Sequence, residues 1–235
     1  MTKAEHFTAD GYGLWRWTQP GGQGVSAGVL DADGALERLR TSWPADTTLV
    51  SAEQVHGASI ASVELHGLPE LVIAGCDGLI TGAHHVALTI RTADCLPIAL
   101  WDRTRRVVAL LHAGWRGLFR GIPGRCVRRL REQYGSEADD LQVAIGPAIH
   151  ACCYEVGRDF PSAFRAFCGE RAGKVFCDLI GSARQQLREA GVRDERILDS
   201  GVCTACAPGR WYSVRRQGQA TGRLLSYIAL SLEVR

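Results

Sequence analysis

The stretch that most constrains this chain covers residues 91–117, RTADCLPIALWDRTRRVVALLHAGWRG. It contains two almost continuous apolar runs, at 95–101 and 107–111, with a charged turn between them. Short apolar runs separated by such a turn are typical of two buried strands joined as a hairpin. An antiparallel hairpin places the beginning of its first strand beside the end of its second. We therefore expect Cys95 and His112 to lie close together.

A thiolate and an imidazole held on neighbouring strands are two of the three protein ligands that a catalytic zinc site uses, because such a site keeps its fourth position open for water or substrate. His56 is the best placed of the seven histidines to be the third ligand, since it lies in a loop between two strand-like segments. A single cysteine at the start of a strand is, however, more often a small core residue. No CxxC or HExxH pattern involves these residues, so the residues alone leave both interpretations open.

Length and composition place the chain among ordinary globular proteins. It has 235 residues, of which 46% are hydrophobic and 22% charged, and its 27 basic and 25 acidic residues give a net charge of +2. This near balance gives no reason to expect nucleic acid or a membrane as a partner. No apolar run reaches the about 18 residues of a membrane span, and no secretory signal opens the chain. We therefore expect a cytoplasmic protein, and we also expect a monomer.

The chain has nine cysteines, an odd number spread over a long sequence. A disulfide framework is therefore not expected, and we predict reduced thiols. Cys203 and Cys206 form one CxxC-like pair in VCTACAP. A single pair without a second pair, or without a histidine partner at zinc-finger spacing, is a weak metal signal, so a structural role is the preferred interpretation.

The pattern of apolar residues predicts a single α/β domain covering residues 1–235, because no repeat, low-complexity tract or linker interrupts it. We expect strands at 47–50, 59–65, 86–91, 141–145, 196–198, 211–214 and 224–232, and helices at 33–42, 118–134, 158–167 and 178–190. The glycine-rich segment at 21–26 matches no phosphate-binding pattern and is predicted to be a flexible turn.

Several motifs together resemble those of a known family. They are EQVHG (53–57), CDGLIT (76–81), TADCLPIAL (92–100), HAGWRG (112–117), IGPAIHACCYEVG (145–157), CT (203–204) and YSVRRQGQATGR (212–223). These motifs are similar to those of the YfiH-like laccase-domain family, whose members are also described as polyphenol oxidases or multicopper-oxidase-like proteins. The resemblance runs from about residue 47 to the C-terminus. It implies the laccase-domain fold, which is an α/β domain of mixed sheets with flanking helices.

The resemblance also implies that His56, Cys95 and His112 are zinc ligands, the same three residues that the hairpin argument selects. Copper is the alternative metal, because it binds such ligands more tightly than zinc does. The laccase name comes from reported copper-dependent phenol oxidation. Multicopper oxidation needs several copper ions held by many histidines, commonly in HxH or HCH pairs. This chain has seven histidines and no HxH pair, which argues against laccase chemistry.

Family members that this chain resembles are described as purine nucleoside phosphorylases that act on adenosine, inosine, guanosine and S-methyl-5'-thioadenosine and also deaminate adenosine. Some bacterial members are described instead as peptidoglycan editing factors, which remove a wrongly incorporated amino acid from a UDP-MurNAc precursor of the cell wall. Water on a zinc ion, with its pKa lowered to about 7, would serve deamination or amide hydrolysis. Phosphorolysis requires phosphate binding instead. A metal-binding interaction protein without turnover is the third hypothesis.

Three polar residues are candidates for catalysis. Arg116, in the HAGWRG loop, is expected to hold phosphate through a charge-assisted hydrogen bond, with a solvated structural arginine as the alternative. Asp94 is expected to orient a ligand or act as a general base, or else to cap backbone groups at the entry of a strand. Gln54 lies two residues before His56, so an extended chain would place both side chains on one face. There Gln54 would bond a purine edge or the metal-bound water.

The expected substrates are a purine nucleoside and phosphate, and Arg116, Cys153 and Arg215 are the expected substrate-binding residues. A buried, inert thiol is the alternative for Cys153. Residues 1–45 are divergent: Gln19 stands where the family usually has an arginine, and no Asn-Leu-Gly follows. If that arginine holds an anionic substrate in relatives, this chain must use another cation. Tyr-Ser-Val-Arg at 212–215 also replaces the usual Phe-Ser-Tyr-Arg.

Overall fold

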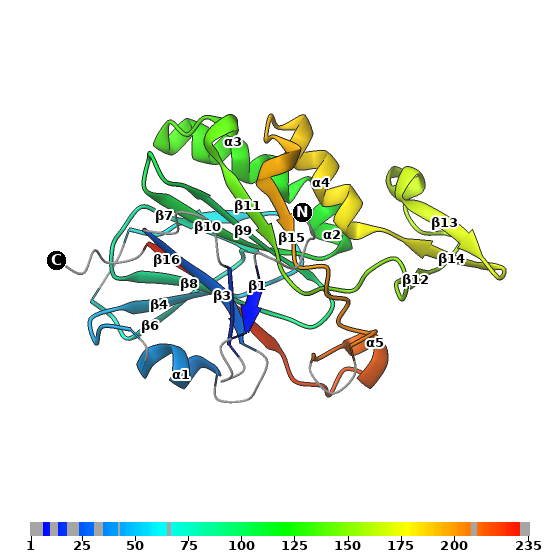
Figure 1. Cartoon of the computed structure of the whole chain (residues 1–235), viewed down its shortest axis with the longest axis horizontal. Coiled ribbons are helices and arrows are strands. Elements are labelled where there is room, and N and C mark those ends of the chain that lie inside the picture. The colour runs from blue at the N-terminus through cyan, green and yellow to red at the C-terminus, as the bar shows by residue number, and fades with distance from the viewer. Residues whose placement is uncertain are drawn as a thin grey trace.

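The computed structural model describes residues 7–9, 14–17, 24–30, 35–41, 43–64, 67–207 and 211–230. Two large β-sheets lie face to face in this part of the chain, with helices on their outer sides (Figure 1). Both sheets contain parallel and antiparallel pairs. The expectation of an α/β protein with mixed sheets and flanking helices is confirmed.

The first sheet has seven described strands and contains both ends of the described chain. Its order is β1 (Phe7–Ala9), β2 (Leu14–Trp17), β3 (Val25–Leu30), β16 (Leu224–Leu230), β8 (Val86–Thr92), β4 (Thr48–Ala52) and β6 (Glu70–Ile73). Helix α1 (Ala35–Thr41) packs on its outer face, where Leu39 contributes to an apolar cluster with β-strand residues.

The second sheet has six described strands, in the order β15 (Ile197–Asp199), β11 (Gln142–Ile145), β9 (Leu96–Asp102), β10 (Val107–Ala113), β7 (Gly78–Thr81) and β5 (Ile60–Ser62). Helices α2 (Trp115–Phe119), α3 (Ile122–Tyr134) and α4 (Leu179–Glu189) cover its outer face (Figure 1). A small third sheet, β12 (Glu155–Val156), β14 (Lys174–Cys177) and β13 (Cys168–Arg171), projects to one side. None of the helices among the described residues is both long and apolar enough to cross a bilayer.

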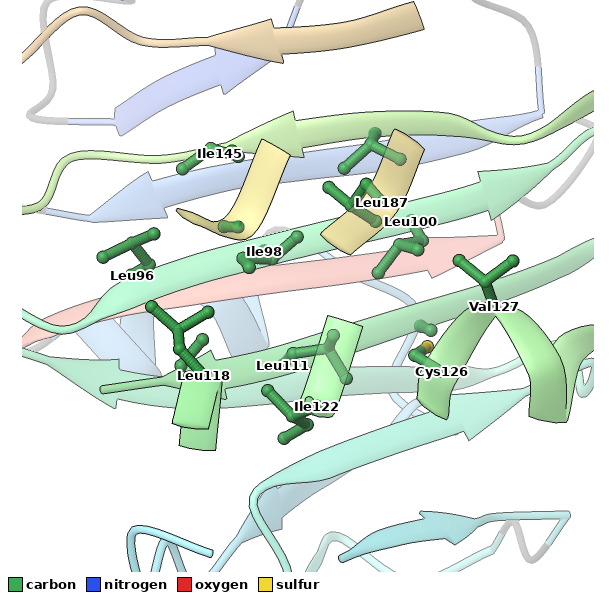
Figure 2. Packing of buried hydrophobic residues seen from close by; sticks show 14 of the residues in the cluster. Leu96, Ile98, Leu100, Leu111, Leu118, Ile122, Cys126, Val127, Ile145 and Leu187 are labelled. Atoms are coloured by element: carbon green, nitrogen blue, oxygen red, sulfur yellow. The ribbon is translucent and has the colours of Figure 1, made fainter. Parts of the chain in front are cut away.

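The predicted β9–β10 hairpin is confirmed, and it forms the centre of the core. Alternate residues of β9 contribute to different clusters: Leu96, Ile98 and Leu100 pack with the helices, whereas Ala99 and Trp101 pack against the other sheet. Figure 2 shows the helix-facing layer, in which Leu96, Ile98 and Leu111 lie among side chains of α2, α3 and α4. A strand buried on both faces has no polar face, which is why both runs are continuously apolar in the sequence.

Four local predictions differ from the structure. Val25 and Ser26 begin β3 instead of belonging to a flexible turn, because β3 pairs along its whole length with the distant β16; residues 21–23 lie outside the described residues. The predicted helix 118–134 is two helices, since Gly121 has a left-handed φ of 74° between them. The expected helix at 158–167 is reduced to a short 3-10 turn, Ser162–Phe167. The predicted strand at 211–214 leads instead into helix α5 (Val214–Gln217), whose first turn is capped by the Ser213 hydroxyl.

The prediction of reduced thiols throughout is also wrong at one place. Cys168 and Cys177 form a disulfide across the β13–β14 hairpin, where they are direct cross-strand partners. The sequence contains no signal for this hairpin that we recognised. The other described cysteines are free.

Candidate metal centre and substrate cavity

The β9–β10 hairpin brings two of the predicted metal ligands together. In its register His112 is opposite Pro97, and Ala113 is opposite Leu96. Cys95 directly precedes Leu96, so its side chain lies beside the end of β10. The predicted proximity of Cys95 and His112 follows from this local pairing.

A single buried carboxylate holds the two histidines of the centre. One oxygen of Asp77 accepts a hydrogen bond from the backbone N–H of His56 at 2.9 Å and another from Nδ1 of His112 at 2.8 Å. The second oxygen accepts from the backbone N–H of Gly57 at 2.6 Å. Asp77 is 0% exposed. Because Nδ1 of His112 donates to this carboxylate, its Nε2 is the atom left for a metal, as in many metal sites with a carboxylate behind a histidine.

His56, Cys95 and His112 converge, with ligand atoms within 4.8 Å of one another. The two imidazole rings meet edge to face, with centroids 4.8 Å apart. The close approach of Cys95 and His56 also requires glycine at position 114. A Cβ there would lie 3.0 Å from the Cys95 sulfur and 3.5 Å from the His56 ring. Ligands held at about 2.0–2.3 Å from one zinc ion lie about 3.3–3.8 Å apart in a tetrahedral site. Small side-chain rotations therefore suffice to seat one ion, and two imidazoles and one thiolate fit the donor set of an open zinc site.

The charged forms of Cys95, His112 and Asp77 stabilise one another. Burial raises the pKa of the Cys95 thiol, but hydrogen bonds to His112 and His56 outweigh this effect and lower it to about 7. Burial lowers the pKa of His112, but the hydrogen bonds to Asp77 and Cys95 outweigh it and raise this pKa to about 9. Burial also raises the pKa of Asp77, whereas its hydrogen bonds to His112 and Gly57 bring it below its ordinary value. The Cys95 thiolate, the Asp77 carboxylate and protonated His112 therefore stabilise one another, and a metal ion at Nε2 would take the place of a His112 proton.

The three residues open into a cavity of about 790 Å³. This volume is within the usual range for small-molecule sites, about 300–1,000 Å³. The cavity is lined by Glu53, Gln54, His56, Arg91, Thr92, Ala93, Asp94, Cys95, His112, Ile149, Tyr154, Val214, Arg215, Gln219 and Arg223. The metal centre therefore faces a space large enough for a nucleoside.

Three arginines line this cavity. The guanidinium of Arg215 donates to the carbonyl of Glu155 at 2.7 Å, and that of Arg223 donates to the carbonyls of Thr221 and Gly222. Among the described residues, the Arg91 guanidinium has no hydrogen-bond or ion-pair partner, and Arg91 is exposed at the cavity. These three side chains place positive charge at the cavity, whereas Gln19 lies outside the described residues.

The structure gives Gln54 and Asp94 definite partners. The extended conformation predicted between Gln54 and His56 is wrong, because their φ angles are 67° and 58°, in the left-handed region. Gln54 lines the cavity, and its amide donates to the Arg91 carbonyl and accepts from the Arg91 N–H, at 2.6 and 2.8 Å. The Asp94 carboxylate accepts from the Thr204 hydroxyl at 2.7 Å and from the Arg215 backbone N–H at 2.8 Å. Both side chains therefore position neighbouring backbone, and their catalytic roles stay predictions.

Two of the expected substrate-binding residues are placed differently from the prediction. Arg116 belongs to helix α2 instead of a loop, is not among the residues that line the cavity, and packs its guanidinium 4.5 Å from the ring of Trp115. Cys153 does not line the cavity either, because its sulfur points to Cys206, 3.0 Å away. Arg215 lies at the cavity as expected.

Two residues with a place in this site were missed by sequence reasoning. Asp77 was part of the CDGLIT motif, and a carboxylate just before the fully buried strand β7 was the available signal. Tyr154, in the CCYEVG motif, lines the cavity with its ring 5.3 Å from the Arg215 guanidinium. Burial raises the pKa of Tyr154 to about 12, and Cys95 adds to this rise, whereas Arg215 and Arg116 oppose it. Its hydroxyl is therefore a neutral hydrogen-bond donor within the cavity.

Comparison with known proteins identifies the family of this chain. A family model described as multi-copper polyphenol oxidoreductase laccase matches residues 30–231. The chain belongs to this family. The fold is also that of the protein YlmD from Geobacillus stearothermophilus, whose crystal structure superposes with a TM-score of 0.88 at 29% identity, over 97% of this chain and 99% of that one.

Two curated relatives have names that indicate an activity. A protein named purine nucleoside phosphorylase, from Aquifex aeolicus, is 41% identical over 56% of this chain and 61% of its own length, so the match spans less than two thirds of that relative. A protein named adenosine deaminase RL5, from an unknown prokaryotic organism, is 32% identical over 77% of this chain and 74% of its own length. These names support the conclusion that the chain is an enzyme of this family.

Proposed function

We propose that this protein is a zinc-dependent purine nucleoside phosphorylase that acts on adenosine, inosine, guanosine and S-methyl-5'-thioadenosine and also deaminates adenosine. The observation that carries this proposal is the three-ligand centre of His56, Cys95 and His112 at a cavity that is also lined by three arginines. An open metal position suits deamination, and cationic groups in the same space suit phosphate. The names of the two relatives support both activities.

A zinc ion with three protein ligands supplies a Lewis acid and lowers the pKa of a bound water to about 7. The protein's own part is to hold the ligands in place. Asp77 fixes the ring of His112 through Nδ1 and the His56 backbone through its N–H, so neither histidine needs to reorganise when substrate binds. The buried strand β10 closes the other side of the centre, so water approaches the ligands from the cavity.

Phosphate binding is assigned to the arginines. Arg91 is the leading candidate, since its guanidinium has no partner among the described residues and a guanidinium binds phosphate through paired, charge-assisted hydrogen bonds. Arg223, which follows helix α5 in the chain, adds positive charge to the same cavity. Arg116 is not assigned to phosphate, because it lies outside the cavity lining.

The same ligand inventory argues against multicopper oxidation as the principal activity, despite the description of the family model. Among the described residues, two groups of three or more potential metal ligands occur, and one of them contains no histidine. A copper ion would find nitrogen and sulfur ligands at the His/Cys/His centre, but a cluster of several histidine-bound copper ions has no place in this set.

The proposal is tested by incubating the purified, zinc-loaded protein with each nucleoside, with and without phosphate, and separating the products by chromatography. The expected products are the free base and a ribose 1-phosphate in the presence of phosphate, and inosine from adenosine in its absence. His112→Ala should abolish both activities. His85→Ala is a matched control, because His85 is a partly exposed histidine that pairs with Asp46 away from the centre.

Failure to form free base or inosine from any nucleoside, with zinc bound, would remove the proposal. Release of an amino acid from a UDP-MurNAc precursor under the same conditions would replace it with the peptidoglycan-editing function. Loss of activity in His85→Ala as large as in His112→Ala would show that the variants report stability and not the centre.

A further inference from the structure

A second group of potential metal ligands lies outside the cavity. The sulfur atoms of Cys152, Cys153, Cys203 and Cys206 all lie within 4.8 Å of one another. Cys206 is central, with its sulfur 3.3 Å from that of Cys152 and 3.0 Å from that of Cys153. The CxxC-like pair, Cys203 and Cys206, thus lies beside the vicinal pair, Cys152 and Cys153. Cys206 is 54 and 53 residues from these two cysteines in the chain.

These distances match one metal ion. At a zinc–sulfur distance of about 2.3 Å, two thiolates lie about 3.8 Å apart in a tetrahedral site, and no more than about 4.6 Å apart in any arrangement. Four sulfurs within 4.8 Å of one another therefore need only small rotations to surround one ion. The Cys206 sulfur is close to the sulfurs of both Cys152 and Cys153, as around one ion, whereas a disulfide would join it to only one of them.

The two loops are joined by backbone contacts and their carbonyl groups are held by arginines. Ala148 and Cys203 form a parallel β-bridge that sets the loops side by side. The Arg171 guanidinium donates to the Cys152 carbonyl at 2.9 Å, and the Arg216 guanidinium donates to the Thr204 carbonyl at 3.0 Å. The cysteines are therefore held in place from both sides and do not depend on contacts among themselves.

Backbone N–H groups also point at one sulfur of the group. The N–H of His150 lies 3.5 Å from the Cys203 sulfur, and the N–H groups of Cys206 and Ala205 face the same atom. Such donors stabilise a negatively charged sulfur, which is the form that binds a metal. Cys203 is buried, whereas Cys152 and Cys206 are exposed, so an ion has a path from solvent.

We propose that Cys152, Cys153, Cys203 and Cys206 bind one zinc ion as a closed, structural site. Four thiolates leave no open position, so this ion takes no direct part in turnover. Its role is to hold the two loops that complete one wall of the cavity. Thr204, between the two cysteines of the second pair, donates to Asp94, and Tyr154 directly follows Cys153 and lines the cavity. The site is independent of the proposed enzymatic function.

The test is a metal count on wild-type protein and three variants, each purified in reducing buffer without chelator and analysed by elemental and native mass spectrometry. We expect two zinc ions per wild-type chain, one in Cys95→Ser/His112→Ala and one in Cys203→Ser/Cys206→Ser. Cys126→Ala is the matched control, because Cys126 is a free cysteine buried in α3, and it should keep both ions. Cobalt substituted into Cys95→Ser/His112→Ala should show the intense sulfur-to-cobalt charge-transfer absorption of a thiolate site.

A second measurement covers the case in which the cysteine variants do not fold. In wild-type protein, alkylation followed by peptide mass spectrometry should find the four cysteines protected while zinc is bound and labelled after chelation, whereas Cys126 stays unlabelled in both states. One zinc per wild-type chain that disappears in Cys95→Ser/His112→Ala would overturn the proposal. Disulfide-linked peptides joining Cys206 to Cys152 or Cys153 in the freshly purified protein, or iron in place of zinc, would overturn it too. All these measurements count metal ions or reactive thiols, so their outcome does not depend on whether the protein acts on nucleosides.

Discussion

The two ligand groups differ in every property that separates an open metal site from a closed one. The His56/Cys95/His112 centre has three ligands, two of them nitrogen, a buried carboxylate behind it and a cavity in front. The Cys152/Cys153/Cys203/Cys206 group has four sulfurs, arginines that hold its loops, and no place in the cavity lining. Three ligands leave one position of a tetrahedral ion open and four ligands fill it, which is the basis of the proposed division into a catalytic site and a structural site.

A hydrogen-bonded contact links the two groups. Asp94 adjoins the ligand Cys95, and its carboxylate is bonded to Thr204 of the cysteine loop and to the backbone of Arg215. Disturbance of the cysteine group should therefore reach the cavity through one hydrogen-bonded contact. Variants that change only the open centre or only the cysteine group are therefore the sharpest test of the proposed division into a catalytic site and a structural site.

The largest effect is expected from removal of a ligand of the open centre. His112→Ala should lower kcat/KM for adenosine deamination by more than about 100-fold, since changes in the groups behind a metal ligand already cost about 10–100-fold. Steady-state kinetics at saturating zinc measure this loss. Equal losses in His112→Ala and in Cys206→Ser would break the proposed division of roles.

The next effect concerns the carboxylate behind the open centre. Asp77→Asn should weaken zinc binding at that centre by about 10–100-fold, because an amide cannot accept from all three N–H donors that the carboxylate serves. Competition with a chromogenic chelator measures the affinity. Asp102→Asn is the matched control, because Asp102 is also a buried carboxylate but caps the β9–β10 turn. If the control weakens zinc as much, Asp77 acts through stability only.

A smaller effect is expected at the anion side of the cavity. Arg91→Gln should raise KM for phosphate about tenfold, which corresponds to the loss of one charge-assisted hydrogen bond worth about 1.5 kcal/mol. Deamination of adenosine without phosphate should change little in the same variant. Arg188→Gln, on the exposed face of α4, is the control. An unchanged KM for phosphate in Arg91→Gln would assign phosphate to another cation.

The smallest effect should arise at the contact between the two groups. Thr204→Val removes the hydrogen bond to the Asp94 carboxylate, and such bonds to charged groups contribute about 1.5–3 kcal/mol. We expect a decrease of this size in the free energy of unfolding, measured by urea denaturation, with only a few-fold change in kcat/KM. Thr204→Ser keeps a hydroxyl and should restore most of the stability. Failure of this rescue would mean that the methyl group of Thr204, and not its hydrogen bond, matters.

Much of the first centre was predictable because its key contact is local. Two apolar runs and a charged turn predict a hairpin, and the hairpin register alone places Cys95 near His112. The conformation around His56 was not predictable, because its left-handed backbone depends on the carboxylate of Asp77, which comes from another strand. The placement of Arg116 was not predictable for a similar reason: the segment expected to be a loop is helix α2, and the Arg116 guanidinium packs against the Trp115 ring.

The cysteine group was missed because its two halves are far apart in the chain. Vicinal cysteines at 152 and 153 match no metal spacing, and one CxxC pair is a weak signal. The parallel pairing of β11 with β15, followed by the bridge between Ala148 and Cys203, is what brings the loops together.

The sequence by itself determined the buried hairpin at the centre of this protein, the amphipathic helix α4 and two of the three ligands of the open centre. Each of these follows from a short-range pattern, because turn composition and the spacing of apolar residues act over a few residues. Only the tertiary structure decided the arginines of the cavity, the position of Asp77 behind the histidines and the meeting of the four cysteines. Those arrangements depend on which distant strands pair and on how the two sheets pack. Strand pairing and sheet packing are determined by the burial of the whole core and not by any short segment.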